Sequence, residues 1–298
     1  MFGLTRAAYL WMISRMPRLW KLMYEVSDRR NMAEKPVRGI APVERLLERL
    51  LREWKPDAVV CTYMVYPYML DSLASRTDRA VPYLTVVTDS FVINKSWLCS
   101  KSPLWAVTDP WTRAIMEEKG LPQDRLRVTG FPVNPVLGAL AKEHPLSWKE
   151  GEPFRVLYFA QRSARHARAE LAGMLDANPA LHVTCILGRR FRRIYPRIRD
   201  LRARYGRRLT VRGWTRRVPS YLAASHVVVG KAGGATVHEV LAAARPMLVN
   251  FLLPGQEEGN TRLLGKTGRR RPCAGCPRPG FRSSGNDGGR RRAVEAHA

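Results

Sequence analysis

The chain has 298 residues, of which 51 are Lys or Arg and 25 are Asp or Glu, so its formal net charge is +26. This length allows one large domain or two ordinary ones with a full apolar core. The charge far exceeds that of an ordinary soluble enzyme and indicates attraction to polyanions such as nucleic acid, anionic lipid or nucleotide phosphates. No apolar run is as long as a membrane span. The five cysteines suggest neither a disulfide framework nor a complete zinc site, so we expect a cytoplasmic protein without a bound metal.

The segment from Leu4 to Glu25 predicts an amphipathic helix with interleaved aromatic and basic residues. One interpretation is a helix that packs its apolar face on the rest of the protein. The other is an interfacial helix whose aromatic side chains enter a lipid surface while its cations meet anionic headgroups. The candidate membrane-contacting residues are Trp11, Arg15, Arg18, Trp20 and Lys21.

From Pro42 onward, nearly all-apolar strand-like runs alternate with helical segments, first as "DAVVCTY", "YLTVVTD", "LWAVT" and "RLRVTGF". After a polar, Pro- and Gly-containing stretch the alternation restarts with "FRVLYFA". This pattern predicts parallel sheets covered on both faces, hence an α/β protein with two doubly wound, Rossmann-like domains. The expected divisions are a first domain over 1–143, a linker over 144–153, a second domain over 154–264 and a disordered Arg/Gly-rich tail over 265–298.

The stretch "KAGGATVHE" from Lys231 to Glu239 follows the apolar run "HVVVG" and opens a helix. Paired glycines at a helix start can simply form a turn that ends the strand, or they can allow a diphosphate to bind free backbone N–H groups. The next strand-to-helix loop, "PGQEEGN", concentrates amides and carboxylates, which hydroxyl-rich sugars require. Together the two loops predict a nucleotide-sugar site.

The whole region "KAGGATVHEVLAAARPMLVNFLLPGQEEGN" resembles the donor site of monogalactosyldiacylglycerol synthases and related bacterial diacylglycerol glycosyltransferases, members of glycosyltransferase family 28 with the GT-B fold. "VVTDSFVINKSWL" and "WAVTDPWTRAIMEEKGLPQDRLRVTGFPVNP" resemble the acceptor-domain blocks of that family, and the likeness covers about residues 1–264. It implies that 1–143 is the lipid-acceptor domain and 154–264 the UDP-sugar donor domain. The implied reaction is inverting transfer of glucose or galactose from a UDP-sugar to diacylglycerol at an anionic membrane surface. The resemblance implies no cofactor, no catalytic metal, no specific nucleic acid, and a peripheral location on the inner face of the plasma membrane.

The resemblance also implies roles for individual residues. Asp89 is the best candidate for a catalytic base, although a strand-end cap is an equally simple interpretation of it. Asn94 stands where the family pattern has a histidine, and an amide carries no proton. Trp97 matches the pattern and is assigned to the acceptor site, while His238 is expected on a helix surface. The implied donor contacts are Gly233, Gly234 and Thr236 for the diphosphate, Glu239 for ribose, Gln256, Glu257 and Asn260 in the hexose loop, and Arg212, Gly213 and Trp214 beside the uracil.

Two departures lead us to expect an incomplete version of such an enzyme. The family's first strand and its glycine-rich loop have no counterpart before the Leu4 helix. The composition also changes abruptly after Leu264, as a shifted reading frame would produce. We therefore expect weak or no activity. The alternatives are a peptidoglycan N-acetylglucosaminyltransferase-like enzyme and a non-catalytic, basic membrane- or nucleic-acid-binding protein.

Overall fold

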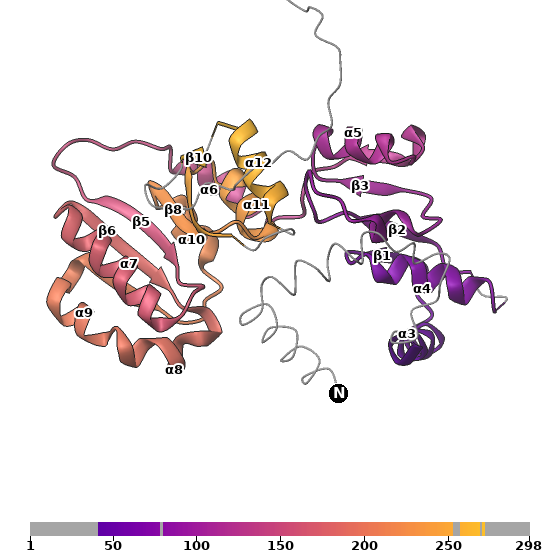
Figure 1. Ribbon diagram of the computed structural model, residues 1–298, viewed down its shortest axis with the longest axis horizontal. Coiled ribbons are helices and arrows are strands. Elements are labelled where there is room, and N and C mark those ends of the chain that lie inside the picture. The colour runs from indigo at the N-terminus through magenta and orange to yellow at the C-terminus, as the bar shows by residue number, and fades with distance from the viewer. Residues whose placement is uncertain (1–40, 78–79, 253–256, 269, 272–298) are drawn as a thin grey trace, which may run out of the picture.

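The computed structural model describes residues 41–77, 80–252, 257–268 and 270–271 (Figure 1). Two predictions therefore lie outside the described residues: the Leu4–Glu25 helix with its five candidate membrane residues, and the tail beyond residue 271. Among the described helices, none is both long enough and apolar enough to cross a bilayer.

The first half of the chain forms a four-stranded parallel sheet in the order β1-β2-β3-β4. An α-helix precedes β1 and an α-helix follows β1, β3 and β4, whereas only the short 3-10 helix Lys95–Leu98 lies between β2 and β3. The strands are β1 Val59–Cys61, β2 Tyr83–Val86, β3 Trp105–Val107 and β4 Leu126–Val128, and the helices are α3 Ala41–Trp54, α4 Val65–Ala74, α5 Pro110–Glu118 and α6 Val136–Glu143.

The second half forms a six-stranded parallel sheet in the order β10-β9-β8-β5-β6-β7. Its strands are β5 Phe154–Phe159, β6 Leu181–Ile186, β7 Leu209–Arg212, β8 Val227–Lys231, β9 Met247–Phe251 and β10 Arg270–Arg271. Its helices are α7 Ala164–Ala177, α8 Phe191–Ile194, α9 Arg199–Tyr205, α10 Val218–Ala223, α11 Gly234–Ala242 and α12 Glu258–Lys266. The prediction of an α/β protein with two parallel sheets is confirmed. Regular structure also continues past the expected start of the tail, because α12 runs to Lys266 and β10 pairs with β9.

The strand order of the second sheet reverses between β5 and β8. From β5 the chain winds outward through β6 to β7, and it then returns to β8 and winds the other way. Loops that leave the carboxyl ends of the two central strands diverge to opposite faces and leave a crevice, which is where open α/β sheets bind ligands. The loops after β5 and β8 are therefore the expected walls of a site.

Both faces of the second sheet are covered because β5 alternates its apolar side chains between two cores. Val156 and Tyr158 enter the core under α7 and α9, whereas Leu157 enters the core under α10 and α11. Each of these side chains is at most 4% exposed. Burial of one such side chain contributes roughly 1.5–3 kcal/mol.

Helix α6 precedes the expected linker but packs on the second half. Its Leu137 is fully buried in the core that includes Val237 and Val240 of α11. Arg245, 2% exposed, fixes the following segment by donating hydrogen bonds to the carbonyls of His144 and Ala223. The physical join between the halves thus lies before α6.

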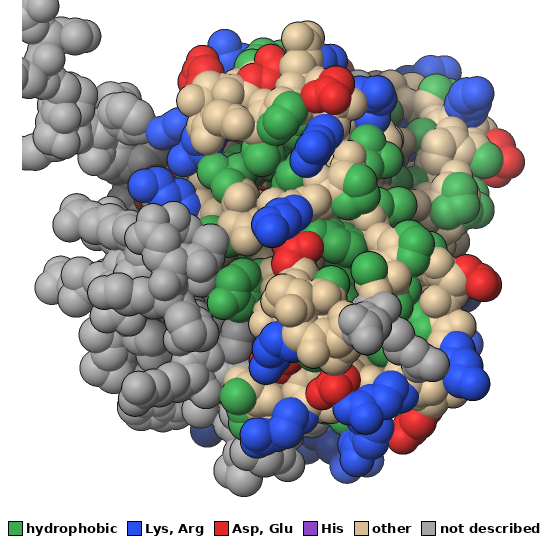
Figure 2. All heavy atoms as spheres, turned by 90° about the vertical axis from the view of Figure 1, so that its right-hand side faces the viewer, with side chains coloured by type: hydrophobic (Ala, Val, Ile, Leu, Met, Phe, Trp, Pro, Cys, Tyr) green, Lys and Arg blue, Asp and Glu red, His purple; other side chains and the backbone are tan. Residues whose placement is uncertain are grey.

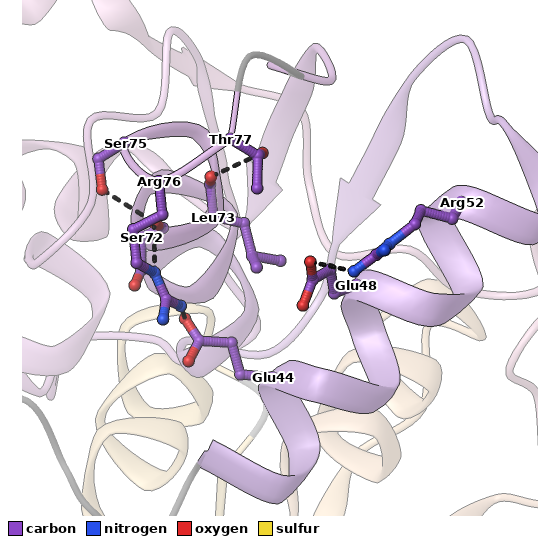
Figure 3. Close-up of polar contacts among 8 residues, drawn as sticks. All are labelled: Glu44, Glu48, Arg52, Ser72, Leu73, Ser75, Arg76 and Thr77. Carbon is purple, nitrogen blue, oxygen red and sulfur yellow. Dashed lines mark hydrogen bonds and ion pairs between the residues drawn. The ribbon is translucent and has the colours of Figure 1, made fainter.

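Helix α3 lies at the outer side of the first half and is tied to α4 through charged side chains (Figure 3). Arg76, just beyond the end of α4, donates to the Glu44 carboxylate and also to the Ser72 carbonyl at 3.2 Å. Glu48 pairs with Arg52 along the exposed side of α3. None of the residues of α3 is buried. Figure 2 shows hydrophobic side chains interspersed with charged ones on one face of the protein. Large hydrophobic side chains exposed in the first half include Trp54, Val60, Tyr63 and Tyr66.

Candidate functional site

The centre of the site is the turn from β8 into α11, at the switch point of the second sheet. Gly233 is the N-cap of α11, with extended backbone and no side chain capping the helix. The first N–H groups of a helix have no intrahelical acceptor, so they attract an anion, and the helix dipole adds to this attraction. The turn that the sequence predicted as a diphosphate seat therefore opens a helix whose first N–H groups no side chain caps.

Lys231 lies directly over this turn, and the sequence interpretation missed it. The pairing of β8 with β9 is irregular here, because Gly230 pairs with Val249 and Lys231 with Phe251, which leaves Asn250 of β9 as the extra residue. A Cβ placed on Gly233 would lie 3.2 Å from Lys231 Nζ and 3.6 Å from Glu257 Oε1, so this pair lies directly above the glycine. The signal was a lysine at the end of an apolar strand directly before two glycines.

The second loop supports the turn from behind. Glu257, 3% exposed, forms an ion pair with Lys231, and Asn260, 5% exposed, donates from Nδ2 to the Ala232 carbonyl at 2.9 Å. The structure therefore places these two predicted hexose residues against the diphosphate turn, with their polar atoms holding it in shape. Gln256, predicted beside them, lies outside the described residues.

Thr236 and Glu239 lie further along α11 and are half-buried. Burial raises the pKa of the Glu239 carboxyl above its usual value. The carboxylate stands one turn beyond the open helix start, where it can accept hydrogen bonds from a ribose.

The predicted uracil residues are not brought to this turn. Arg212, Gly213 and Trp214 follow β7, and β5 and β6 separate β7 from β8. Three interstrand spacings amount to about 14 Å, which a nucleotide with its diphosphate at α11 would have to span. Trp214 is 59% exposed, and the Arg216 guanidinium lies over its ring.

The loop after β5 forms the facing wall of the crevice. Arg190 clamps it by donating to the carbonyls of Gln161 and Arg162, and burial lowers the pKa of Arg190. The Gln161 side-chain oxygen Oε1 is buried and has no hydrogen-bond partner among the described residues. An unsatisfied buried acceptor is costly and indicates a donor that completes the site.

Asp89 follows β2 and supplies the carboxylate of the first half. Its Oδ2 accepts a hydrogen bond from Trp97 Nε1 at 2.8 Å. Burial raises the pKa of Asp89, and the Trp97 hydrogen bond offsets part of that rise. A carboxylate with a raised pKa is a stronger base at neutral pH.

The assignments of Asn94 and Trp97 need correction. Asn94 is 1% exposed and caps the short helix Lys95–Leu98, accepting the Ser96 N–H at 2.9 Å, so its contact is with the backbone rather than with a substrate. Trp97 is 2% exposed in the core of the first half, so it cannot line a membrane surface. Its ring instead fixes the position of Asp89.

The Asp89 loop packs directly on the donor-site helices, which brings the two halves together. A Cβ on Gly234 would lie 3.3 Å from the Thr88 carbonyl oxygen, and one on Gly259 would overlap the Ser90 carbonyl oxygen. Phe91 in this loop has a φ of 60°, an uncommon conformation for a bulky residue, and its ring stacks on Trp111. Sequence separation hid this contact, because residues 88–92 and 234–259 meet only in the folded chain.

His238 is buried in this interface, contrary to the expected helix-surface position, and is 8% exposed. Its ring stacks on Phe131 with centroids 4.4 Å apart, and Nε2 lies 3.2 Å from Ser90 Oγ. Ser90 Oγ is 2.9 Å from Thr108 Oγ1, which in turn donates to Asp109 at 2.7 Å. Burial lowers the pKa of His238 to about 4, so the ring is neutral at pH 7. A buried polar relay thus joins α11 to the first half.

Within the part of the chain that the structure describes, no group of three or more His, Cys, Asp or Glu side chains could hold a metal ion. The chemistry that the described crevice supports is electrostatic. It combines an open helix start, a lysine over it and a carboxylate on the opposing half.

Two parallel α/β halves that meet at the switch point of the second sheet define the GT-B-like class. Two solved structures share this architecture: UDP-GlcNAc 2-epimerase from Neisseria meningitidis bound to UDP-GlcNAc, and MurG from Acinetobacter baumannii. The first has a TM-score of 0.52 at 13% identity over 75% of this chain and 66% of that one. The second has a TM-score of 0.51 at 16% identity, and the match covers 78% of this chain and 64% of that one. These likenesses concern the fold alone.

The family model of monogalactosyldiacylglycerol (MGDG) synthase matches residues 3–133. The processive diacylglycerol beta-glucosyltransferase of Staphylococcus carnosus is 26% identical over 231 residues, 76% of this chain and 58% of that protein. The protein of the same name from Bacillus subtilis is 23% identical over 224 residues, 73% of this chain and 57% of that protein. Residues 3–133 are thus similar to the MGDG synthase family, and the chain is distantly homologous to the processive diacylglycerol beta-glucosyltransferases. It spans less than three fifths of the length of these two relatives.

Proposed function

We propose that this protein transfers a hexose from a UDP-sugar to diacylglycerol with inversion, as a peripheral protein on the cytoplasmic face of a membrane. One observation carries the proposal. The uncapped start of α11, with Lys231 over it, lies in contact with the loop that holds Asp89. A proposed leaving-group site and the loop that carries the candidate base thus meet at the join of the two halves.

In this proposal the diphosphate binds at Gly233, Gly234 and Thr236, and Glu239 accepts hydrogen bonds from the ribose. The diacylglycerol hydroxyl oxygen attacks the anomeric carbon on the face opposite the diphosphate, and Asp89 takes the hydroxyl proton. The bond between the anomeric carbon and the diphosphate oxygen breaks, and UDP leaves with the electron pair. The helix dipole and the Lys231 ammonium stabilise the negative charge that develops on the diphosphate.

The rest of the proposed site follows from the two loops. Glu257 and Asn260 hold the turn, and with Gln256 they form the hexose side of the pocket. Gln161 supplies a free acceptor from the facing wall. Arg212, Gly213 and Trp214 contact the uracil only if the nucleotide extends along the carboxyl edge of the sheet to β7.

Calorimetric titration with UDP tests the donor half directly. We expect saturable binding that Glu239→Gln weakens about tenfold, since a hydrogen bond to a charged group contributes roughly 1.5–3 kcal/mol. Glu118→Gln, an exposed position on α5, is the matched control and should bind as the unmodified protein does.

Transfer is then assayed with radiolabelled UDP-glucose or UDP-galactose and diacylglycerol in mixed micelles, with the lipid product separated by chromatography. UDP binding with transfer that Asp89→Asn abolishes would support the full proposal. UDP binding without transfer would favour a non-catalytic protein, a reading that the backbone-capping role of Asn94 also favours. Absence of saturable UDP binding would refute the proposal.

A further inference from the structure

A second candidate site lies at the outer edge of the second sheet, away from the switch point. A cavity of about 400 Å³ there is lined by β7, by Gly206 and by three arginines, Arg202 of α9, Arg207 and Arg212. β7 is the last strand of the sheet on this side, with β6 as its only neighbour among the described strands. We call this cavity the arginine groove.

The groove lies in the most basic segment of the described chain. Between Gly188 and Arg212 there are eleven arginines and a single acidic residue, Asp200. Asp200 is already engaged, because Arg168 binds both of its carboxylate oxygens at 2.5 and 2.6 Å. No acidic residue of the segment remains to neutralise the groove.

Some arginines of the segment have structural roles and are not available to a ligand. Arg190 clamps the loop after β5, Arg204 pairs with Asp176, and Arg208 donates to the carbonyls of Leu175 and Asn178. By contrast, the guanidinium groups of Arg202, Arg207 and Arg212 form no hydrogen bond or ion pair with the described residues. Three unpaired guanidinium groups around one cavity produce a concentrated positive potential, which an anion neutralises.

The chemistry of the ligand follows from the side chains. Guanidinium groups bind phosphate oxygens through paired N–H donors, and a cavity of this volume accepts a small phosphorylated group. The site is distinct from the proposed diphosphate seat, because β5 and β6 lie between β7 and β8. In Figure 1 the basic helices α8 and α9 lie along the lower edge of the second half, as α3 does along that of the first. A flat surface below the molecule would meet both.

We propose that the arginine groove binds the phosphate of an anionic phospholipid headgroup and so docks the second half of the protein on an anionic bilayer. The choice of a lipid as the source of the phosphate rests on the proposed lipid substrate; the anion site itself rests only on the groove. The groove would hold the donor half at the surface from which the acceptor comes.

The test is flotation of the full chain with vesicles of phosphatidylcholine alone, and with vesicles of phosphatidylcholine and phosphatidylglycerol in equal amounts. We expect binding to the anionic vesicles only, and we expect Arg202→Glu combined with Arg207→Glu to weaken it at least tenfold, since each cation near an anionic surface contributes about 1 kcal/mol. Lys119→Glu with Arg125→Glu makes the same charge change at exposed positions of the first half and is the matched control. Arg202→Lys with Arg207→Lys should retain part of the binding, because lysine keeps the positive charge but lacks the paired N–H donors of the planar guanidinium group.

Equal loss in the groove variant and in the control would overturn the proposal, since the effect would then be one of net charge. Unchanged binding of the groove variant would also overturn it. Loss of vesicle binding on addition of soluble glycerol phosphate, at an ionic strength matched with chloride, would assign the groove to a free phosphate and overturn the lipid assignment. UDP titration of the same variants separates this inference from the proposed function. The groove variant should bind UDP normally, and failure of UDP binding in every variant would refute the transferase without affecting the groove.

Discussion

Gly259, in the first turn of α12, lies so close to the first half that any added side-chain atom would collide with it. A Cβ there would overlap the Ser90 carbonyl oxygen, and it would lie 2.8 Å from the Val92 nitrogen and 3.0 Å from the Ser90 carbonyl carbon. Ordinary contact begins near 3.4 Å, so even the Val92 nitrogen must retreat by about 0.6 Å, and the Ser90 oxygen by more. All of these atoms belong to backbone, so no side-chain rotation can relieve the overlap.

We therefore expect Gly259→Ala to push the Asp89 loop away from α12. The 3.2 Å contact between His238 and Ser90 would stretch beyond hydrogen-bonding distance and leave buried polar atoms unpaired. Overpacking costs about 1–3 kcal/mol and an unsatisfied buried group about 1–3 kcal/mol, so the free energy of unfolding should fall by roughly 2–6 kcal/mol. This is a large part of the ~5–15 kcal/mol of a typical domain.

Urea denaturation followed by circular dichroism measures this change. Gly265→Ala is the matched control on the same helix, because a Cβ there meets nothing within 4 Å. Alanine is favoured over glycine inside a helix by about 0.5–1 kcal/mol, so the control should be neutral or slightly more stable. If the halves separate without unfolding, the pKa of His238 should rise towards 6.5. Equal stability of the two variants together with an unchanged His238 pKa would refute the close contact.

Three further predictions concern the polar contacts of the first half and the interface. Because the pKa of His238 is lowered from 6.5 to about 4, the folded state binds fewer protons than the unfolded state in this range. Stability should then fall on acidification from pH 6.5 to 4 by up to ~1.4 kcal/mol per pH unit relative to His238→Gln, as acid-dependent denaturation would show. Trp97→Phe should cost about 1–2 kcal/mol and raise the pKa of Asp89 further, measured by carboxyl NMR titration, since Asp89 loses the hydrogen bond that offsets its burial. Arg76→Ala should destabilise the protein by less than about 1 kcal/mol in urea denaturation, because the pair with Glu44 is largely exposed on the arginine side.

Each of these has a result that would contradict it. Parallel stability–pH curves for the unmodified protein and His238→Gln would mean that the histidine titrates normally. An unchanged Asp89 pKa in Trp97→Phe, with the exposed Trp214→Phe as control, would mean that the indole does not touch the carboxylate. A loss of several kcal/mol in Arg76→Ala would show that α3 depends on that pair for its docking.

The sequence by itself determined the fold class and the position of the glycine turn from β8 into α11. Both signals are local, since strand-forming apolar runs alternate with helical segments and two glycines follow an apolar strand. Backbone sterics and hydrophobic periodicity act over a few residues, so both can be inferred from the sequence without knowledge of the tertiary contacts. For the same reason the carboxylate-rich loop after β9 could be assigned to the same edge of the sheet.

Only the tertiary structure decided which side chains face one another. Lys231 pairs with Glu257 above Gly233, Trp97 turns inward to hold Asp89, and His238 is buried because a loop from the other half covers its helix. Each of these placements depends on contacts between residues far apart in the chain, whose geometry is set by the packing of two sheets. The crowded backbone at Gly259 has the same origin: the sequence shows a glycine, and the fold shows why no larger residue fits there.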